Sequence, residues 1–156
     1  MMEKRYTLND GRTIAIRTVE NGDIRGLKAL YQRLYRDDAE PWTQLLTPSE
    51  IDNRFESPNG FIGLVTKHNE EVVAYTEIEV DQSKSGYLRI HVHPEFQGVG
   101  LGTAMMIALL NEAKTRGIQR IRLKVSETNT RALRFFQKFG FQTTKREQGA
   151  IEMIKR

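Results

Sequence analysis

A glycine-rich segment of this sequence has the composition of an anion-binding loop. Residues 97–102 read QGVGLG and stand between a segment that alternates like a strand and one with helical spacing. Glycine allows a backbone to approach a ligand closely, because no Cβ stands in the way. The first N–H groups of a helix have no partner within it, and its amino end carries about half a positive charge. We therefore predict that the N–H groups of Val99 to Thr103 bind phosphate or pyrophosphate.

Two other phosphate-binding patterns do not fit this segment. The dinucleotide fingerprint requires Gly-x-Gly-x-x-Gly, whereas glycines stand here at 98, 100 and 102 and are followed by Thr103. A P-loop ends in Gly-Lys-Ser or Gly-Lys-Thr, whereas Gly102 is followed by Thr103 and Ala104. A glycine-rich connection that binds no ligand is the alternative that the residues leave open.

A second set of polar residues lies on a predicted hairpin that joins residues 72–80 to residues 87–92. Strand alternation assigns one apolar face to Val72, Ala74, Ile78, Leu88, Ile90 and Val92. The other face carries Tyr75, Glu77, Glu79, Tyr87, Arg89 and His91. A turn near Ser83 would bring Glu77 opposite Arg89 and close to His91. Either Glu77 forms a cross-strand ion pair, or Glu77 or His91 is a catalytic base that acts through water.

Thiol and metal chemistry are not predicted. The chain has no cysteine, which excludes disulfides, thiolate metal ligands and a cysteinyl acyl intermediate. His91 and His93 alternate on a strand, but no third ligand stands near them in the sequence. We therefore predict no metal site.

The composition is that of one globular domain over residues 1–156. Apolar residues make up 38% and charged residues 28% of the chain, with four prolines. Neither a signal peptide nor an apolar run of about 18 residues is present, so we expect a cytoplasmic protein without membrane contact. The net charge of +4 suits a polyanionic small ligand. Nucleic acid is not expected, because the basic residues 120, 122 and 124 have no aromatic residues interleaved with them.

The elements that must position these residues can be predicted from periodicity and from turn signals. Strands are expected at 14–19, 61–66, 72–80, 87–92, 118–125, 141–146 and 150–154. Helices are expected from Asp23 to about Tyr35, from Thr47, from Thr103 to Arg116, and from Asn129 to Phe139. The order β-α-α-β-β-β-α-β-α-β-β predicts an α/β fold. Its mixed, mostly antiparallel sheet would have about seven strands, with helices on both faces.

Two motifs resemble the signatures of the GNAT superfamily of N-acetyltransferases. The QxxGxG pattern at 97–102, preceded by VHP at 92–94, is similar to the superfamily's cofactor loop. Downstream, NxxA at 129–132 with GF at 140–141 resembles its next helical segment. The resemblance extends to the element order over nearly the whole chain.

The resemblance implies an acetyl-CoA-dependent N-acetyltransferase that moves the acetyl group directly from the thioester to a primary amine of a small molecule, peptide or protein. A monomer or a homodimer is expected. The strand that ends at Val92 would splay from its neighbour and pair with the pantetheine arm. The implied cofactor-binding residues are Val92, Gln97, Gly98, Val99, Gly100, Leu101, Gly102, Thr103, Asn129 and Phe136. Asn129 either contacts CoA or caps its helix. Arg131, Arg134 and Lys138 lie near the 3′-phosphate or on a solvated face.

Three positions depart from the family's catalytic patterns. Phe136 stands where family members that protonate the thiolate have tyrosine, and Lys124 and Gly86 stand where others have a glutamate base. The catalytic residues can therefore not be inherited from the motifs. Glu77 and His91 remain the base candidates, and a non-catalytic acyl-CoA-binding sensor or regulatory module is the alternative function.

Two features bear on the acceptor amine. Asp37, Asp38 and Glu40 stand beside Trp42 and could attract a cationic amine, although exposed acidic loops are common. Asp-Gly-Arg at 10–12 resembles a subgroup that includes protein lysine acetyltransferases. Ionisation favours an α-amine instead, because its pKa of about 7.8 lies far below the value of about 10.4 for lysine.

Overall fold

A computed structural model describes residues 3–36 and 44–156. Its strands are β1 (Lys4–Thr7), β2 (Thr13–Thr18), β3 (Phe61–His68), β4 (Glu71–Val80), β5 (Ser85–Val92), β6 (Arg120–Ser126), β7 (Gln142–Glu147) and β8 (Ala150–Lys155). Its α-helices are α1 (Ile24–Arg36), α2 (Pro48–Glu56), α3 (Leu101–Thr115) and α4 (Thr130–Lys138). Short 3₁₀ turns include η1 (Asn21–Asp23) and η4 (Pro94–Phe96). Of the helices within these ranges, none is both long and apolar enough to span a membrane.

The strands of the described residues form one eight-stranded sheet in the order β1-β2-β3-β4-β5-β6-β8-β7. All neighbours are antiparallel except β5 and β6, which are parallel. This mixed, mostly antiparallel sheet confirms the predicted fold class, with one strand more than expected. The sequence analysis missed β1, because KRYT is short, polar and largely exposed. Pairing with β2, from Lys4 opposite Ile16 to Thr7 opposite Thr13, makes it a strand.

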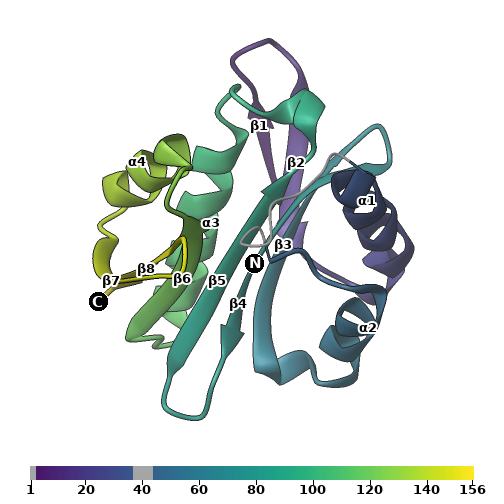
Figure 1. Cartoon of the computed structure of the whole chain (residues 1–156). Coiled ribbons are helices and arrows are strands. Elements are labelled where there is room, and N and C mark those ends of the chain that lie inside the picture. The colour runs from purple at the N-terminus through teal and green to yellow at the C-terminus, as the bar shows by residue number, and fades with distance from the viewer. Residues whose placement is uncertain (1–2, 37–43) are drawn as a thin grey trace.

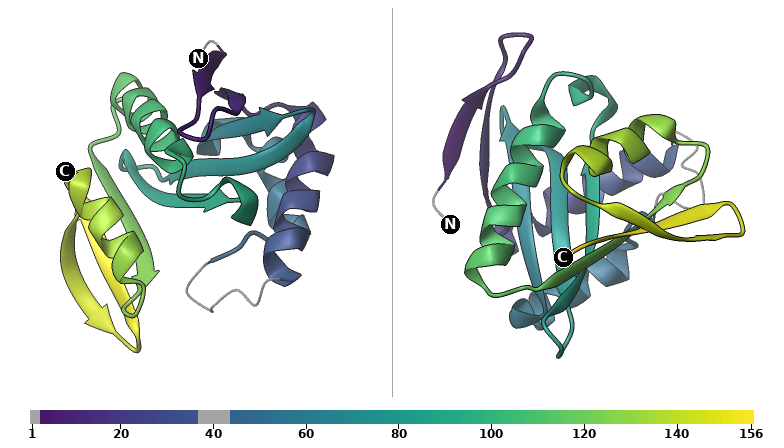
Figure 2. Two further views of the ribbon diagram at one scale, coloured as in Figure 1. Left: turned by 90° about the horizontal axis from the view of Figure 1, so that it is seen from above. Right: turned by 90° about the vertical axis from the view of Figure 1, so that its left-hand side faces the viewer.

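Helices cover both faces of the sheet, with α1 and α2 on one face and α3 and α4 on the other (Figures 1 and 2). On the first face, Leu27 and Leu30 of α1 share a buried cluster with Val65 and Tyr75 of the sheet. On the second face, the fully buried Met105 and Leu109 of α3 belong to a larger cluster. The sheet is therefore the shared wall of two apolar cores, as the helical and strand periodicities predicted.

One predicted face assignment was wrong. The register of β3 and β4 shifts at residues 66 and 67, so that Thr66 pairs with Ala74 but Lys67 pairs with Val72. Because a bulge of this kind reverses the alternation, Val72 packs in the cluster beneath α1, and Val73 joins the cluster beneath α3. The hairpin residues from Ala74 onward keep the predicted faces.

The parallel strands β5 and β6 pair over a short stretch only. Their register covers Ser85 to Tyr87 against Arg120 to Arg122, although both strands continue beyond it. The two strands therefore diverge toward their carboxyl ends. This divergence opens the sheet at the level where α3 begins.

Candidate active site

A cleft of about 540 Å³ occupies the gap between the diverging strands. It is lined by residues 88–92 of β5, by residues 123–126 of β6, and by Gln44. The loop and the first turn of α3 contribute residues 96–98, 100, 102 and 103, and the N-cap and one side of α4 contribute residues 129, 131, 132, 135 and 136. A cleft of this size holds a ligand of several hundred daltons. Of the residues predicted to bind the cofactor, all line this cleft except Val99 and Leu101.

The glycine loop presents open backbone donors to this cleft. Gly98 and Gly100 have φ angles of 74° and 91°, which favour glycine. Gly100 is the N-cap of α3 and has no side chain to bond the first N–H groups of the helix, so these groups are available to an anion. The helix begins at Leu101, two residues before the predicted start. Leu101 itself is fully buried, so its side chain belongs to the core and not to the cleft.

Two side chains organise the surroundings of the loop. The Nε2 atom of Gln97 donates a hydrogen bond to the carbonyl oxygen of Val92, 3.1 Å away, and so ties the loop to the end of β5. The guanidinium of Arg131 on α4 lies beside Gly98, since a Cβ built on that glycine would be 3.3 Å from Nη2. Arg131 also lines the cleft, whereas Arg134 and Lys138 are not among its lining residues.

Asn129 caps the helix α4. Its Oδ1 accepts a hydrogen bond from the backbone N–H of Ala132 at 3.1 Å, which confirms the capping interpretation. The residue also lines the cleft, and a contact with CoA stays a prediction.

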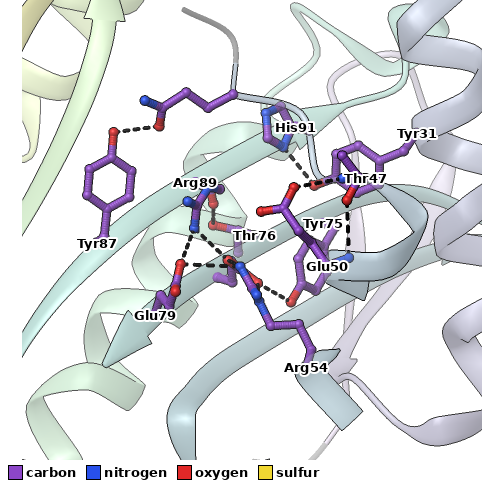
Figure 3. A network of polar contacts seen from close by, with 12 residues as sticks. Tyr31, Thr47, Glu50, Arg54, Tyr75, Thr76, Glu79, Tyr87, Arg89 and His91 are labelled. Carbon is purple, nitrogen blue, oxygen red and sulfur yellow. Dashed lines mark hydrogen bonds and ion pairs between the residues drawn. The ribbon is translucent and has the colours of Figure 1, made fainter. Parts of the chain in front are cut away.

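His91 lines the cleft from β5. Figure 3 shows its imidazole next to the side chain of Tyr31. The residue is 7% exposed, and its Nδ1 lies 2.7 Å from the hydroxyl of Tyr31 on α1. Complete burial and the negative charge of Glu77 raise the pKa of Tyr31 well above its ordinary value. Tyr31 therefore stays neutral at physiological pH, and its hydroxyl can either donate to or accept from the imidazole.

Glu77 lies beneath the cleft and not in it. Its carboxylate is fully buried and accepts two hydrogen bonds from Arg54 on α2, both at 2.9 Å. Arg89 donates a further bond at 2.9 Å and the hydroxyl of Tyr75 another at 2.8 Å. The predicted ion pair between Glu77 and Arg89 is confirmed. Arg54 was not anticipated, because nothing in the sequence links the helix 48–56 to this hairpin.

Two of the three positions that depart from the family pattern, Phe136 and Gly86, have structural explanations. Phe136 is 8% exposed and packs edge-to-face against Phe135 and Phe141. A Cβ at Gly86 would overlap the side chain of Ile78, so that position has no room for a glutamate. Lys124 lines the cleft. Among the described lining residues there is neither a carboxylate nor a tyrosine.

The acidic cluster predicted to attract an amine, Asp37, Asp38 and Glu40, lies outside the described residues, as does Trp42. Of the tyrosines on α1, the helix that precedes this cluster, Tyr31 is buried and Tyr35 is 48% exposed. In the part of the chain that is described, no three metal-ligating side chains gather into a group.

Open backbone donors at a helix start, next to a cleft between diverging parallel strands, form a site that suits a ligand with phosphate groups. Residues 27–141 match the Acetyltransferase (GNAT) family, and the chain belongs to it. Over 124 residues it is 25% identical to the [ribosomal protein bS18]-alanine N-acetyltransferase of Escherichia coli, and the match covers 80% of each chain.

Solved structures share this fold. The GNAT domain of S. lividans PAT has a TM-score of 0.80 at 18% identity, covering 97% of this chain and 95% of that one. An acetyltransferase of Salmonella typhimurium, yncA, was solved with its cofactor acetyl-CoA and has a TM-score of 0.75 at 19% identity, covering 92% and 93%. The protein is thus an N-acetyltransferase that uses acetyl-CoA.

Proposed function

We propose that this enzyme transfers the acetyl group of acetyl-CoA directly to the α-amine of a peptide or protein, with His91 as the base. The proposal rests on which side chains line the cleft. Among its described lining residues, His91 is the one histidine, and there is no carboxylate or tyrosine that could serve as a base instead. The carboxylate of Glu77 accepts four hydrogen bonds, so we propose that Glu77 holds Arg54 and Arg89 in place.

The residues of the loop fit the phosphates of CoA. The open N–H groups at the start of α3, together with Arg131, would hold the pyrophosphate. The exposed edge of β5 near Val92 would pair with the pantetheine arm, since β6 has moved away from it. Asn129 and Phe136 would line the arm. The proposed cofactor-binding set is therefore that of the sequence analysis, with Arg131 added.

The chemistry is a direct transfer. The amine nitrogen forms the new C–N bond, the C–S bond of the thioester breaks, and the proton lost by nitrogen passes through water to the imidazole of His91 and then to solvent. Phe136 cannot protonate the departing thiolate, but an alkyl thiol has a pKa of only about 8.5. The missing acid costs on the order of 10²–10⁴-fold in rate, the usual contribution of such a group.

Deprotonation of the amine favours an α-amine. At pH 7, neutralising an α-amine of pKa about 7.8 costs roughly 1 kcal/mol, whereas a lysine of pKa about 10.4 requires roughly 4.6 kcal/mol. The Escherichia coli relative is named for acetylation of an alanine, which has no side-chain nitrogen, so its acceptor is an α-amine. For the present protein we further propose a single domain that acts in the cytoplasm as a monomer or homodimer.

The test follows release of thiol from acetyl-CoA with two matched peptides at pH 7.5. One peptide begins with a free alanine α-amine, and the other is blocked at its α-amine and carries one lysine. We expect the first to be acetylated at least tenfold faster. Faster acetylation of the lysine peptide would overturn the α-amine assignment. A covalent acetyl-enzyme formed at a competent rate would overturn direct transfer, and binding of CoA without turnover on any amine would favour the sensor.

A further inference from the structure

The hairpin formed by β1 and β2 lies against the cofactor loop. Its turn, residues 8–12, stands next to the segment that leads into α3 (Figure 1). The backbone N–H of Asn9 donates to the carbonyl of Val99 at 3.0 Å. The side-chain amide of Asn9 lies beside Gly100, where a Cβ would come within 3.3 Å of Nδ2. The hairpin thus contacts two residues in the middle of the loop.

Arg12 makes a second connection a few residues upstream in the same segment. Its Nη2 donates to the carbonyl oxygen of Glu95 at 2.7 Å, and its guanidinium lies 3.8 Å from the centre of the Phe96 ring. Phe96 is 5% exposed and belongs to the core beneath α3, as does Leu8 of the hairpin. Arg12 therefore stacks on a fixed ring and holds a carbonyl of the 3₁₀ turn η4.

Asp10 orients the guanidinium of Arg12. Its Oδ2 accepts from Nε at 2.7 Å, and its Oδ1 accepts from the backbone N–H of Arg12 at 3.1 Å. These hydrogen bonds from Arg12 lower the pKa of Asp10, so the carboxylate stays charged at neutral pH. In the turn at residues 10–12, Asp10 thus orients the guanidinium of Arg12 toward η4.

We propose that Arg12 is a positioning residue for cofactor binding, which sets the conformation of the loop from Glu95 to Gly102 without touching the cofactor. The inference rests on the proposed function, because that assigns the pyrophosphate to this loop. Two glycines with positive φ make the loop free to adopt other conformations. Without the contacts of the hairpin, binding would have to supply the entropy cost of ordering these residues.

The experiment compares Arg12→Ala with Arg5→Ala as the matched control. Arg5 lies on the same hairpin, but its side chain is 85% exposed and pairs only with Glu3 among the described residues. Calorimetry measures the Kd for acetyl-CoA, and turnover is measured with acetyl-CoA and with S-acetylpantetheine, which lacks the pyrophosphate. For Arg12→Ala we expect Kd and KM for acetyl-CoA to rise at least tenfold, with unchanged kcat and unchanged kcat/KM for S-acetylpantetheine. Arg5→Ala should behave as the wild type.

The outcomes separate the two proposals. If the wild type binds acetyl-CoA and Arg12→Ala binds it equally well, the inference about Arg12 is overturned and the proposed function stands. A wild type that binds no acetyl-CoA would overturn the proposed function itself. Equal losses with acetyl-CoA and S-acetylpantetheine would show a merely structural role and would also overturn the inference. Should Arg12→Ala not fold, Arg12→Lys, which keeps the charge but not the planar stacking, is expected to raise KM for acetyl-CoA alone.

Discussion

Glu77 and His91 lie on the same face of the sheet but have different surroundings. Glu77 and His91 both point toward the α1/α2 side of the sheet, yet only His91 lines the cleft. The carboxylate of Glu77 accepts from two arginines and a tyrosine, which leaves little capacity to take a proton from a substrate. The Nδ1 atom of His91 is hydrogen-bonded to the hydroxyl of Tyr31, and His91 lines the cleft. At this scale the neighbours, and not the residue type, decide the chemistry.

Replacing His91 should slow acetyl transfer without weakening the cofactor. We expect His91→Ala to lower kcat by about 10²–10⁴-fold, the contribution of a general base, with the Kd for acetyl-CoA unchanged. Any limb of the pH–rate profile that the imidazole produces should disappear. Because the pKa of Tyr31 is raised well above 10, that tyrosine stays neutral below pH 10 and cannot produce the limb.

Tyr31→Phe is the control for this substitution, since it removes the hydroxyl at Nδ1 and keeps the ring. Its effect on kcat should be much smaller than that of His91→Ala. Full turnover in both His91→Ala and Glu77→Gln would remove both base candidates.

At the scale of elements, we expect the junction between the glycine loop and α3 to determine cofactor affinity. Gly102 lies in the first turn of α3, and a Cβ there would meet Phe135 at 3.5 Å, an ordinary contact. Gly102→Val should therefore fold but intrude into the cleft. We expect calorimetry to show at least a tenfold weaker Kd for acetyl-CoA, equivalent to about 1.4 kcal/mol.

Gly22→Ala is the matched control for Gly102→Val, because a Cβ at Gly22 meets no atom within 4 Å. Gly100 is less suitable for this test, since its φ of 91° would strain any side chain regardless of the ligand. Unchanged affinity in a folded Gly102→Val variant would exclude this end of the loop from the phosphate site.

A second junction joins β2 to α1 through a buried ion pair. Asp23 is 3% exposed and accepts two bonds from Arg17 at 2.8 Å. Burial alone would raise the pKa of Asp23, but the hydrogen bonds from Arg17 and from the backbone of Glu20 outweigh it, and the pKa is lowered from 3.8. The folded state thus favours the charged form. Its stabilisation is complete above pH 3.8 and is lost as the pH falls through the lower pKa of the folded state.

Urea unfolding at pH 7 and below pH 3 checks this junction. At pH 7 we expect Asp23→Asn to lower the free energy of unfolding by roughly 3 kcal/mol, because the partly buried guanidinium of Arg17 loses its two hydrogen bonds to a buried carboxylate. Its remaining carboxylate partner, Glu20, is exposed and lies 3.8 Å away. The difference from the wild type should shrink as the pH falls below 3.8 toward the lowered pKa of folded Asp23. Asp52→Asn removes the exposed pair with Lys28 and should cost less than about 1 kcal/mol. A difference that is the same at both pH values would contradict this assignment.

At the scale of the whole molecule, the sheet consists of two parts that meet over three paired residues of β5 and β6. A ligand in the cleft contacts both parts, since the lining residues come from β5 and α3 on one side and from β6 and α4 on the other. Acetyl-CoA at 100 times its Kd should stabilise the folded state by about 2.7 kcal/mol. For a domain of this size we expect the Tm to rise by roughly 5 to 10 °C.

The same thermal scan can be made with Gly102→Val at the same concentration of acetyl-CoA. The rise should be smaller by the amount that corresponds to its weaker Kd. An equal rise in Tm for the wild type and Gly102→Val would show that acetyl-CoA binds away from Gly102.

The sequence by itself determined most elements and the cofactor loop. Its helices and strands follow local periodicity, and a glycine loop before a helix creates an anion site from backbone groups alone. The capping role of Asn129 depends on a residue three positions away, and the start of α2 likewise on Thr47 and Glu50. Features of this kind need no distant partner, which is why the order of residues is sufficient to predict them.

Only the tertiary structure decided which polar residues form the site. β1 becomes a strand because β2 is beside it, and the bulge at Thr66 turns Val72 to the opposite face. Arg54 meets Glu77 across 23 residues of sequence, and Tyr31 meets His91 across 60. A burial energy or a hydrogen bond depends on distances between atoms, and for distant residues packing alone sets those distances. The choice between a structural carboxylate and a base therefore rested on the folded chain.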